Sequence, residues 1–119
     1  MLALAPLASV LLAPDPAPVV DAVGTCDRAA MTSVTKAEPH RRAAFAVAVF
    51  QDLRTLANER AQAEALPVLP KDASGRAALQ AAIDAKRKQV EDARATESAW
   101  RSALDELRAD FLINCSGRK

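Results

Sequence analysis

Two cysteines and one histidine are the residues of this sequence with the strongest capacity for nucleophilic or metal chemistry. His40 stands beside Arg41 and Arg42, and no cluster of Cys, His or carboxylate residues lies near it at ligand spacing. Because a catalytic or metal-binding histidine needs such partners, we expect a solvated His40. Cys26 and Cys115 are far apart in the sequence, whereas a thiol oxidoreductase usually carries a Cys-x-x-Cys arrangement.

Other chemical motifs are missing from the sequence as well. Gly24, Gly75 and Gly117 are isolated, so no glycine-rich loop could cradle a phosphate. The adjacent carboxylates Asp105 and Glu106 would face different ways on a helix, which is typical of a solvent-exposed face. We therefore predict a protein that is not an enzyme, with no catalytic residues, no metal site and no cofactor.

The composition favours an all-α fold with a thin core. Of the 119 residues, 28 are alanine and only four are aromatic. Alanine favours helix but buries little area, and the sequence holds no alternating β-branched run from which a sheet could form. A single small domain with such a core usually needs a covalent cross-link or a partner.

The charge balance argues against a nucleic-acid partner. Sixteen basic and fifteen acidic residues are interleaved along the chain and give a net charge of +1. Nucleic-acid binding domains usually carry a concentrated basic surface, and single strands are bound on aromatic platforms that this sequence lacks. We predict no nucleic-acid binding.

The N-terminus resembles a secretion signal in its pattern. Residues 2–13 form an uncharged apolar run that is too short to span a bilayer but fits the apolar region of a signal peptide. Prolines follow, and Val20-Asp21-Ala22 offers small residues for cleavage. We predict a removable signal peptide at 1–22 and a mature domain at 23–119, located in the periplasm or secreted. The alternatives are an Ala/Pro-rich tail on a cytosolic protein, or a lipobox at Val23-Gly24-Thr25-Cys26.

Prolines divide the rest of the chain into predicted helical segments. We expect helix over 26–37 and 39–65, with a kink at Pro39 because the residue before a proline is pushed out of the helical region. Pro67 and Pro70 then enclose a loop, after which a third helix begins.

The third helix has the clearest periodicity in the chain. Its apolar residues recur at alternating steps of four and three, as in a coiled-coil seam. Lys86 and Glu97 interrupt the seam, either with their stems lying along it or as polar groups that fix the register or a partner. The seam positions are Leu79, Ile83, Lys86, Val90, Ala93, Glu97, Trp100, Leu104, Leu107 and Phe111.

The loop position and the two cysteines together predict a long antiparallel helical hairpin. Residues that face each other in a hairpin lie equally far in sequence from the middle of its loop, and Cys26 and Cys115 meet this condition. We therefore predict a disulfide between them at the open end of the hairpin. The same register places Trp100 beside Arg41 in a cation–π contact. A disulfide would require an oxidising compartment, which independently favours export.

These features predict a non-enzymatic periplasmic or secreted protein that acts as a protein–protein interaction or structural module. An envelope lipoprotein or membrane-surface protein anchored through Cys26 is the alternative. We expect a protein partner and no transmembrane segment in the mature chain. We also expect a weak homodimer, because two stacked hairpins would bury apolar residues that lie outside the seams. The predicted partner surface consists of Val47, Phe50, Val68, Leu69, Leu112 and Ile113.

Overall fold

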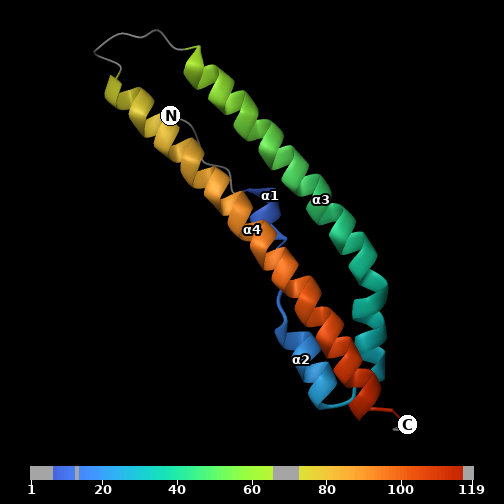
Figure 1. Ribbon diagram of the computed structural model, residues 1–119. Helices are drawn as coiled ribbons and strands as arrows, with labels where there is room; N and C mark the ends of the chain where they lie inside the picture. Colours follow the sequence, from blue (N-terminus) through green and yellow to red (C-terminus); the bar gives the residue numbers. More distant parts are fainter. Residues whose placement is uncertain (1–6, 13, 66–72, 117–119) are drawn as a thin grey trace. The chain divides into compact units, whose positions relative to one another are not determined.

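A computed structural model describes residues 7–12, 14–65 and 73–116, and over these ranges it is helical without strands. The helices are α1 (Ala8–Leu11), α2 (Ala17–Gly24), α3 (Arg28–Glu64) and α4 (Ala73–Asn114). α3 and α4 run antiparallel and pack against each other (Figure 1). The predicted all-α helical hairpin is therefore confirmed.

Contacts within the chain separate it into two compact units, and each contains a stretch of α3 and a stretch of α4. Unit 1 comprises Met1–Leu12 and Phe45–Ala93, and unit 2 comprises Ala13–Ala44 and Arg94–Lys119. Each unit has its own buried cluster. The cluster of unit 1 is Leu7, Phe45, Val49, Leu56, Ile83, Val90 and Ala93. The cluster of unit 2 is Val19, Ala22, Met31, Trp100, Leu104, Phe111 and Cys115.

The predicted seam of α4 matches the burial of that helix. All ten seam positions are buried or partly buried, and Ile83, Val90 and Leu104 are each only 1 % exposed. The periodicity of the sequence therefore identified the buried face of α4, including its two charged positions.

α3 is continuous through Pro39, although the sequence predicts two helical segments there. Pro39 has no N–H to donate to the carbonyl of Thr35, but burial on both sides, at Met31 and Phe45, favours an unbroken helix. The helix begins after Asp27, whose Oδ1 accepts a hydrogen bond of 3.0 Å from the Ala30 N–H, as an N-cap does.

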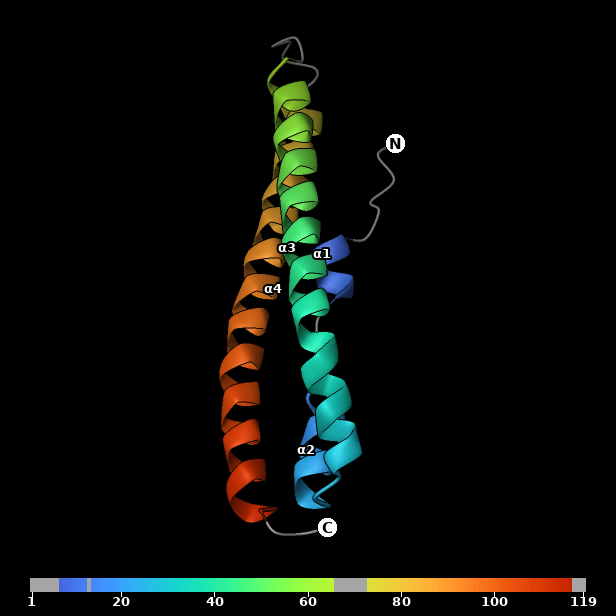
Figure 2. The same ribbon diagram turned by 90° about the vertical axis from the view of Figure 1, so that its right-hand side faces the viewer.

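A carboxylate of α3 binds the start of the chain in unit 1. The Asp52 side chain accepts hydrogen bonds from the backbone N–H groups of Ala8 and Ser9, at 3.2 and 2.9 Å, and from Ser9 Oγ at 2.6 Å. Ser9 is fully buried and Leu7 is 7 % exposed. Figure 2 shows α1 lying beside α3 at this contact. Residues that the sequence assigns to a signal peptide thus pack into the core of this unit.

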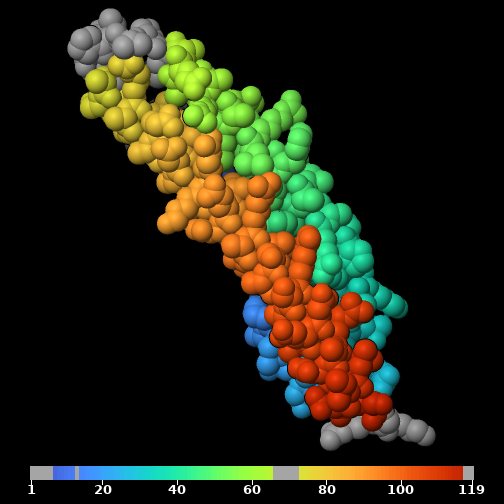
Figure 3. Space-filling view, in the orientation of Figure 1, coloured from blue at the N-terminus to red at the C-terminus, as the bar shows by residue number. Residues whose placement is uncertain are grey.

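α2 packs in the same way in unit 2. Val19 and Ala22 are 2 % and 3 % exposed and lie in the cluster that contains Phe111 and Cys115. In the space-filling view the surfaces of α2 and α4 adjoin within this unit (Figure 3). Nothing in the packing tests whether residues 1–22 are removed, so the signal peptide stays a prediction.

Cys26 forms the turn that joins α2 to α3. Its N–H donates to the carbonyl of Val23 and the next N–H, of Asp27, donates to the carbonyl of Ala22, which is the Schellman pattern of a helix end. The φ angle of Cys26 is 53°, in the left-handed region that glycine usually occupies at this position. A side chain there costs on the order of 1 kcal/mol, which the surrounding contacts must offset.

The predicted disulfide between Cys26 and Cys115 is present. The two Cα atoms are 5.5 Å apart, at a sequence separation of 89 residues. The bond ties Cys26, in the turn before α3, to Cys115, the residue after α4, within unit 2, where Cys115 is 1 % exposed.

We predict that replacing Cys115 with Ala lowers the free energy of unfolding by about 4 kcal/mol, because closing a loop of this length removes entropy from the unfolded chain. Hydrogen exchange should accelerate most in residues 26–38 and 104–115, with smaller changes in unit 1. Equal protection of those segments in the oxidised protein and the variant would contradict the prediction. Urea unfolding and amide exchange measure the two effects.

Candidate functional site

The predicted partner surface divides into two patches that belong to different units. Val47 and Phe50, three residues apart on α3 in unit 1, are 55 % and 66 % exposed. Leu112 and Ile113, at the end of α4 in unit 2, are 71 % and 75 % exposed. The other two predicted residues, Val68 and Leu69, lie outside the described residues.

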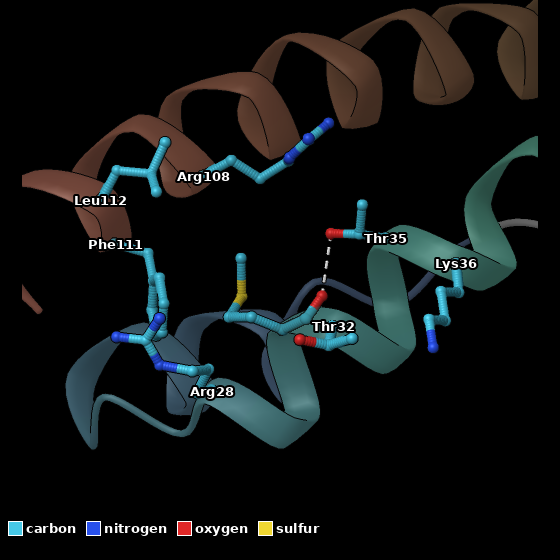
Figure 4. A pocket seen from close by; sticks show the side chains of 8 residues that line it. Arg28, Thr32, Thr35, Lys36, Arg108, Phe111 and Leu112 are labelled. Atoms are coloured by element: carbon cyan, nitrogen blue, oxygen red, sulfur yellow. Dashed lines mark hydrogen bonds between the residues drawn. The ribbon is translucent and has the colours of Figure 1, made fainter. Parts of the chain in front are cut away.

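Unit 2 also has an open pocket between the first turns of α3 and the last turns of α4. Its volume is about 360 Å³. In Figure 4, Arg28, Thr32 and Thr35 project from α3, and Arg108, Phe111 and Leu112 come from the facing part of α4. The complete lining is Arg28, Met31, Thr32, Thr35, Lys36, Arg108, Phe111 and Leu112. The exposed Leu112 therefore belongs to both the patch and the pocket wall.

A buried set of charges connects α3 with α4 in the same unit. Glu38 and Glu97 are only 7 % and 4 % exposed, and carboxylates at this depth need partners. Their partners come from both helices and form what we call the Glu38 network. It consists of Glu38, Arg41, Arg42, Glu97, Trp100 and Arg101.

Arg41 joins the two carboxylates. Its Nε and Nη2 donate to Glu38 at 3.0 and 2.6 Å, and its Nη1 and Nη2 donate to Glu97 at 2.7 and 2.8 Å. This double bidentate contact uses the planar fork of the guanidinium, which lysine could not replace. Arg42 and Arg101 each add a bond through Nε, to Glu38 at 2.9 Å and to Glu97 at 2.8 Å respectively.

Trp100 completes the network and confirms the predicted register. Its Nε1 donates to Glu38 at 3.0 Å, so the buried indole N–H is satisfied. The Arg41 guanidinium carbon lies 5.7 Å from the centre of the indole ring, within cation–π range. The pairing of Trp100 with Arg41 follows from equal distance to the loop, and the structure has this contact.

Both carboxylates of the network are held in the ionised state. Burial alone would raise the pKa of Glu38, but the hydrogen bonds from Arg41, Arg42 and Trp100 outweigh it and lower the pKa from 4.5 to about 2. Burial likewise opposes ionisation of Glu97, whose two arginine partners lower its pKa below the usual value. The hydrogen bonds to both carboxylates raise the pKa of the Arg41 guanidinium. A general acid or base works best with a pKa near the working pH, so these groups fit a structural role.

The second interruption of the seam is also paired, within unit 1. Lys86 Nζ lies 3.0 Å from Glu59 Oε1 on α3, with the two side chains 13 % and 19 % exposed. Lys86 and Glu97 thus each reach a partner on α3 of opposite charge. The sequence left two alternatives for these residues, stems that lie along the seam or polar groups that set the register. Their ion pairs with α3 favour the second alternative.

Sequence reasoning missed the buried carboxylates of α3. A hydrophobicity scale assigns Glu38 and Asp52 to the solvent side of the helix, whereas both are buried. The seven-residue spacing of Met31, Glu38, Phe45 and Asp52 would have revealed them, since residues seven apart share one face of a helix.

The remaining candidate groups offer little chemistry. His40 is exposed, as predicted. Among the residues that the structure describes, no three His, Cys, Asp or Glu side chains are grouped so that they could hold a metal ion. The disulfide occupies the Cys26 sulfur that a thioether-linked lipid would need.

We predict that Glu38→Gln lowers the free energy of unfolding at pH 7 by about 2 kcal/mol, because it removes an ionised partner of two arginines. The folded pKa of Glu38 is below its usual value, so its contribution is complete above about pH 4.5 and is lost as the pH falls toward 2. The difference between the variant and the unmodified protein should therefore shrink over that range in urea titrations.

The matched control is Glu64→Gln, which removes an exposed carboxylate with a side chain 70 % exposed. Its effect should be small at every pH. A Glu38→Gln difference that stays constant between pH 7 and pH 2 would contradict the assignment of an ionised, network-stabilised Glu38.

Comparison with known proteins adds no constraint on this site. No protein-family model, no curated protein and no solved structure matches the chain.

Proposed function

We propose that this chain is a non-enzymatic exported protein, periplasmic or secreted, that binds another protein through the disulfide-linked end of α4. The observation that carries the proposal is the exposure of two adjacent large apolar side chains, Leu112 at 71 % and Ile113 at 75 %. Leu112 and Ile113 directly precede Asn114, the last residue of α4, and lie close in sequence to the disulfide at Cys115.

The surroundings of this patch favour binding over catalysis. Clustered exposed apolar side chains on a small protein mark contact surfaces, and a preorganised surface loses less entropy on binding. The disulfide restrains Leu112 and Ile113 because Cys115 follows within three residues. Glu97, the buried carboxylate of α4, is paired with Arg41 and Arg101.

Export is supported by the disulfide and by the apolar N-terminal segment. Disulfides persist in oxidising compartments, and the cytosol keeps most thiols reduced. None of the helices described has the length and apolar character to cross a membrane. Because Ala22 is buried inside α2, cleavage after it would have to take place before the chain folds.

The intact mass of the exported product tests this part of the proposal. We expect a chain that begins at Val23 and has lost two hydrogens through the disulfide. A mass increased by a diacylglycerol at Cys26 would instead establish the anchored lipoprotein. A product that retains residues 1–22 would contradict a removable signal and would make α1 and α2 permanent parts of the fold.

A photo-crosslinking residue at position 113 tests the partner surface. With p-benzoylphenylalanine in place of Ile113 in cells, we expect a defined adduct, whereas the same residue in place of Glu91, an exposed position of α4 outside the predicted partner surface, should give none. An adduct of twice the chain mass would identify the partner as a second copy, in agreement with the predicted weak homodimer. Equal adducts at both positions, or none at position 113, would contradict the proposed surface.

A further inference from the structure

The pocket of unit 2 combines an apolar floor with basic side chains. Met31 and Phe111, which line it, are 5 % and 7 % exposed, and Leu112 forms another part of the wall. Arg28, Lys36 and Arg108 also line it, and no acidic residue does. The volume of about 360 Å³ lies within the range of small-molecule sites.

Two of these cations have no polar partner among the described residues. Arg108 and Lys36 make no hydrogen bond or ion pair with any described residue, whereas Arg41, Arg42 and Arg101 are all paired with carboxylates. Figure 4 shows the Arg108 side chain extending along the pocket toward Thr35, while Lys36 extends away from the other labelled side chains. Arg108 is therefore the cation best placed to meet a ligand inside the pocket.

Two threonine hydroxyl groups also line the pocket. Thr35 Oγ1 donates to the carbonyl of Met31 at 2.8 Å, so its proton is committed. The Thr32 hydroxyl makes no hydrogen bond with the described residues and remains able to donate. In Figure 4 the Thr35–Met31 hydrogen bond lies between the Thr32 hydroxyl and the Arg108 guanidinium, so an anionic head would have Arg108 as its charged donor, and Thr32 would form part of the rim.

We propose that this pocket binds a free amphipathic carboxylate, an acyl chain ending in a single anionic head. The chain would lie against Leu112 and the accessible edges of Met31 and Phe111, and the head would pair with Arg108. A small inorganic anion would leave the apolar floor in water, and a cationic amphiphile would meet like charges. The site goes beyond the proposed protein partner and does not depend on it. None of its lining residues belongs to the segment predicted to be removed.

Dodecanoate, kept below its micellar concentration, is the probe, and the oxidised full chain is the receptor. In ¹H–¹⁵N spectra we expect saturable shifts confined to the lining segments, residues 28–36 and 108–112. Dodecyltrimethylammonium, with the same chain length and the opposite charge, should bind at least about tenfold more weakly, because charge-assisted hydrogen bonds to the head are lost. Equal affinity for the two amphiphiles, or shifts spread over both units, would overturn the proposal.

Two substitutions locate the site, and a third serves as the control. Arg108→Glu should weaken dodecanoate binding about tenfold or more, since it replaces the attractive charge with a repulsive one. Thr32→Trp, at an exposed position, should also weaken binding by filling the pocket without a change in charge. Arg54→Glu, the same charge reversal at an exposed position of α3 outside the pocket lining, should leave the affinity unchanged. If Arg108→Glu behaves like Arg54→Glu while circular dichroism shows all variants folded, the assignment is wrong.

Membrane lipid is the other source of the same chemistry, and flotation with phosphatidylglycerol vesicles distinguishes it. We expect no stable association of the chain with these vesicles at physiological salt. Vesicle binding that Arg108→Glu abolishes, without saturable binding of dodecanoate, would replace the free carboxylate with a membrane headgroup and overturn the proposal. Loss of the position 113 crosslink would not affect either outcome, so this site and the proposed protein-binding surface can fail separately.

Discussion

α3 and α4 face each other across a seam that contains few large apolar side chains. The buried face of α3 includes Glu38 and Asp52, and that of α4 includes Glu97. Alanine-rich helices bury too little area for a stable two-helix pairing, and the ends of such helices fray. The interactions that compensate are directional. In unit 2 they are the disulfide and the Glu38 network, and in unit 1 they are the Lys86–Glu59 pair and the Asp52 contact.

Buried charges of this kind act on specificity more than on stability. Replacing a buried ion pair with apolar side chains is often neutral, whereas removal of one partner leaves an uncompensated charge at a cost of several kcal/mol. Sliding α3 against α4 would separate Arg41 from Glu97, which would keep only Arg101, and would take Trp100 away from Glu38 and Arg41. Because its contacts join α3 to α4 at defined positions, the Glu38 network favours the observed register over a shifted one.

The N-terminal segment has features of both a removable signal and a packed part of the fold. Its apolar run has the pattern of a secretion signal, yet Leu7, Ser9, Val19 and Ala22 are buried against the helices. The two observations are compatible if removal precedes folding, because the contacts are then never formed in the mature chain. In that case Asp52 loses three hydrogen bonds and Val19 and Ala22 leave the unit 2 cluster, which exposes apolar surface near the disulfide. Such exposure agrees with a protein that functions by binding.

The sequence alone determined the helical fold, the buried face of α4 and the pairing of Cys26 with Cys115. Each of these features follows from a local period or from a symmetry about the loop, and none of them requires knowledge of other contacts. The tertiary structure decided what those rules cannot encode. Glu38 and Asp52 are charged residues that a sequence pattern assigns to solvent, and their burial depends on donors distant in the sequence, Trp100 for Glu38 and Ser9 for Asp52. The pocket of Arg108 and Thr32 forms where the first turns of α3 meet the last turns of α4, and it depends on side-chain packing that no sequence period encodes.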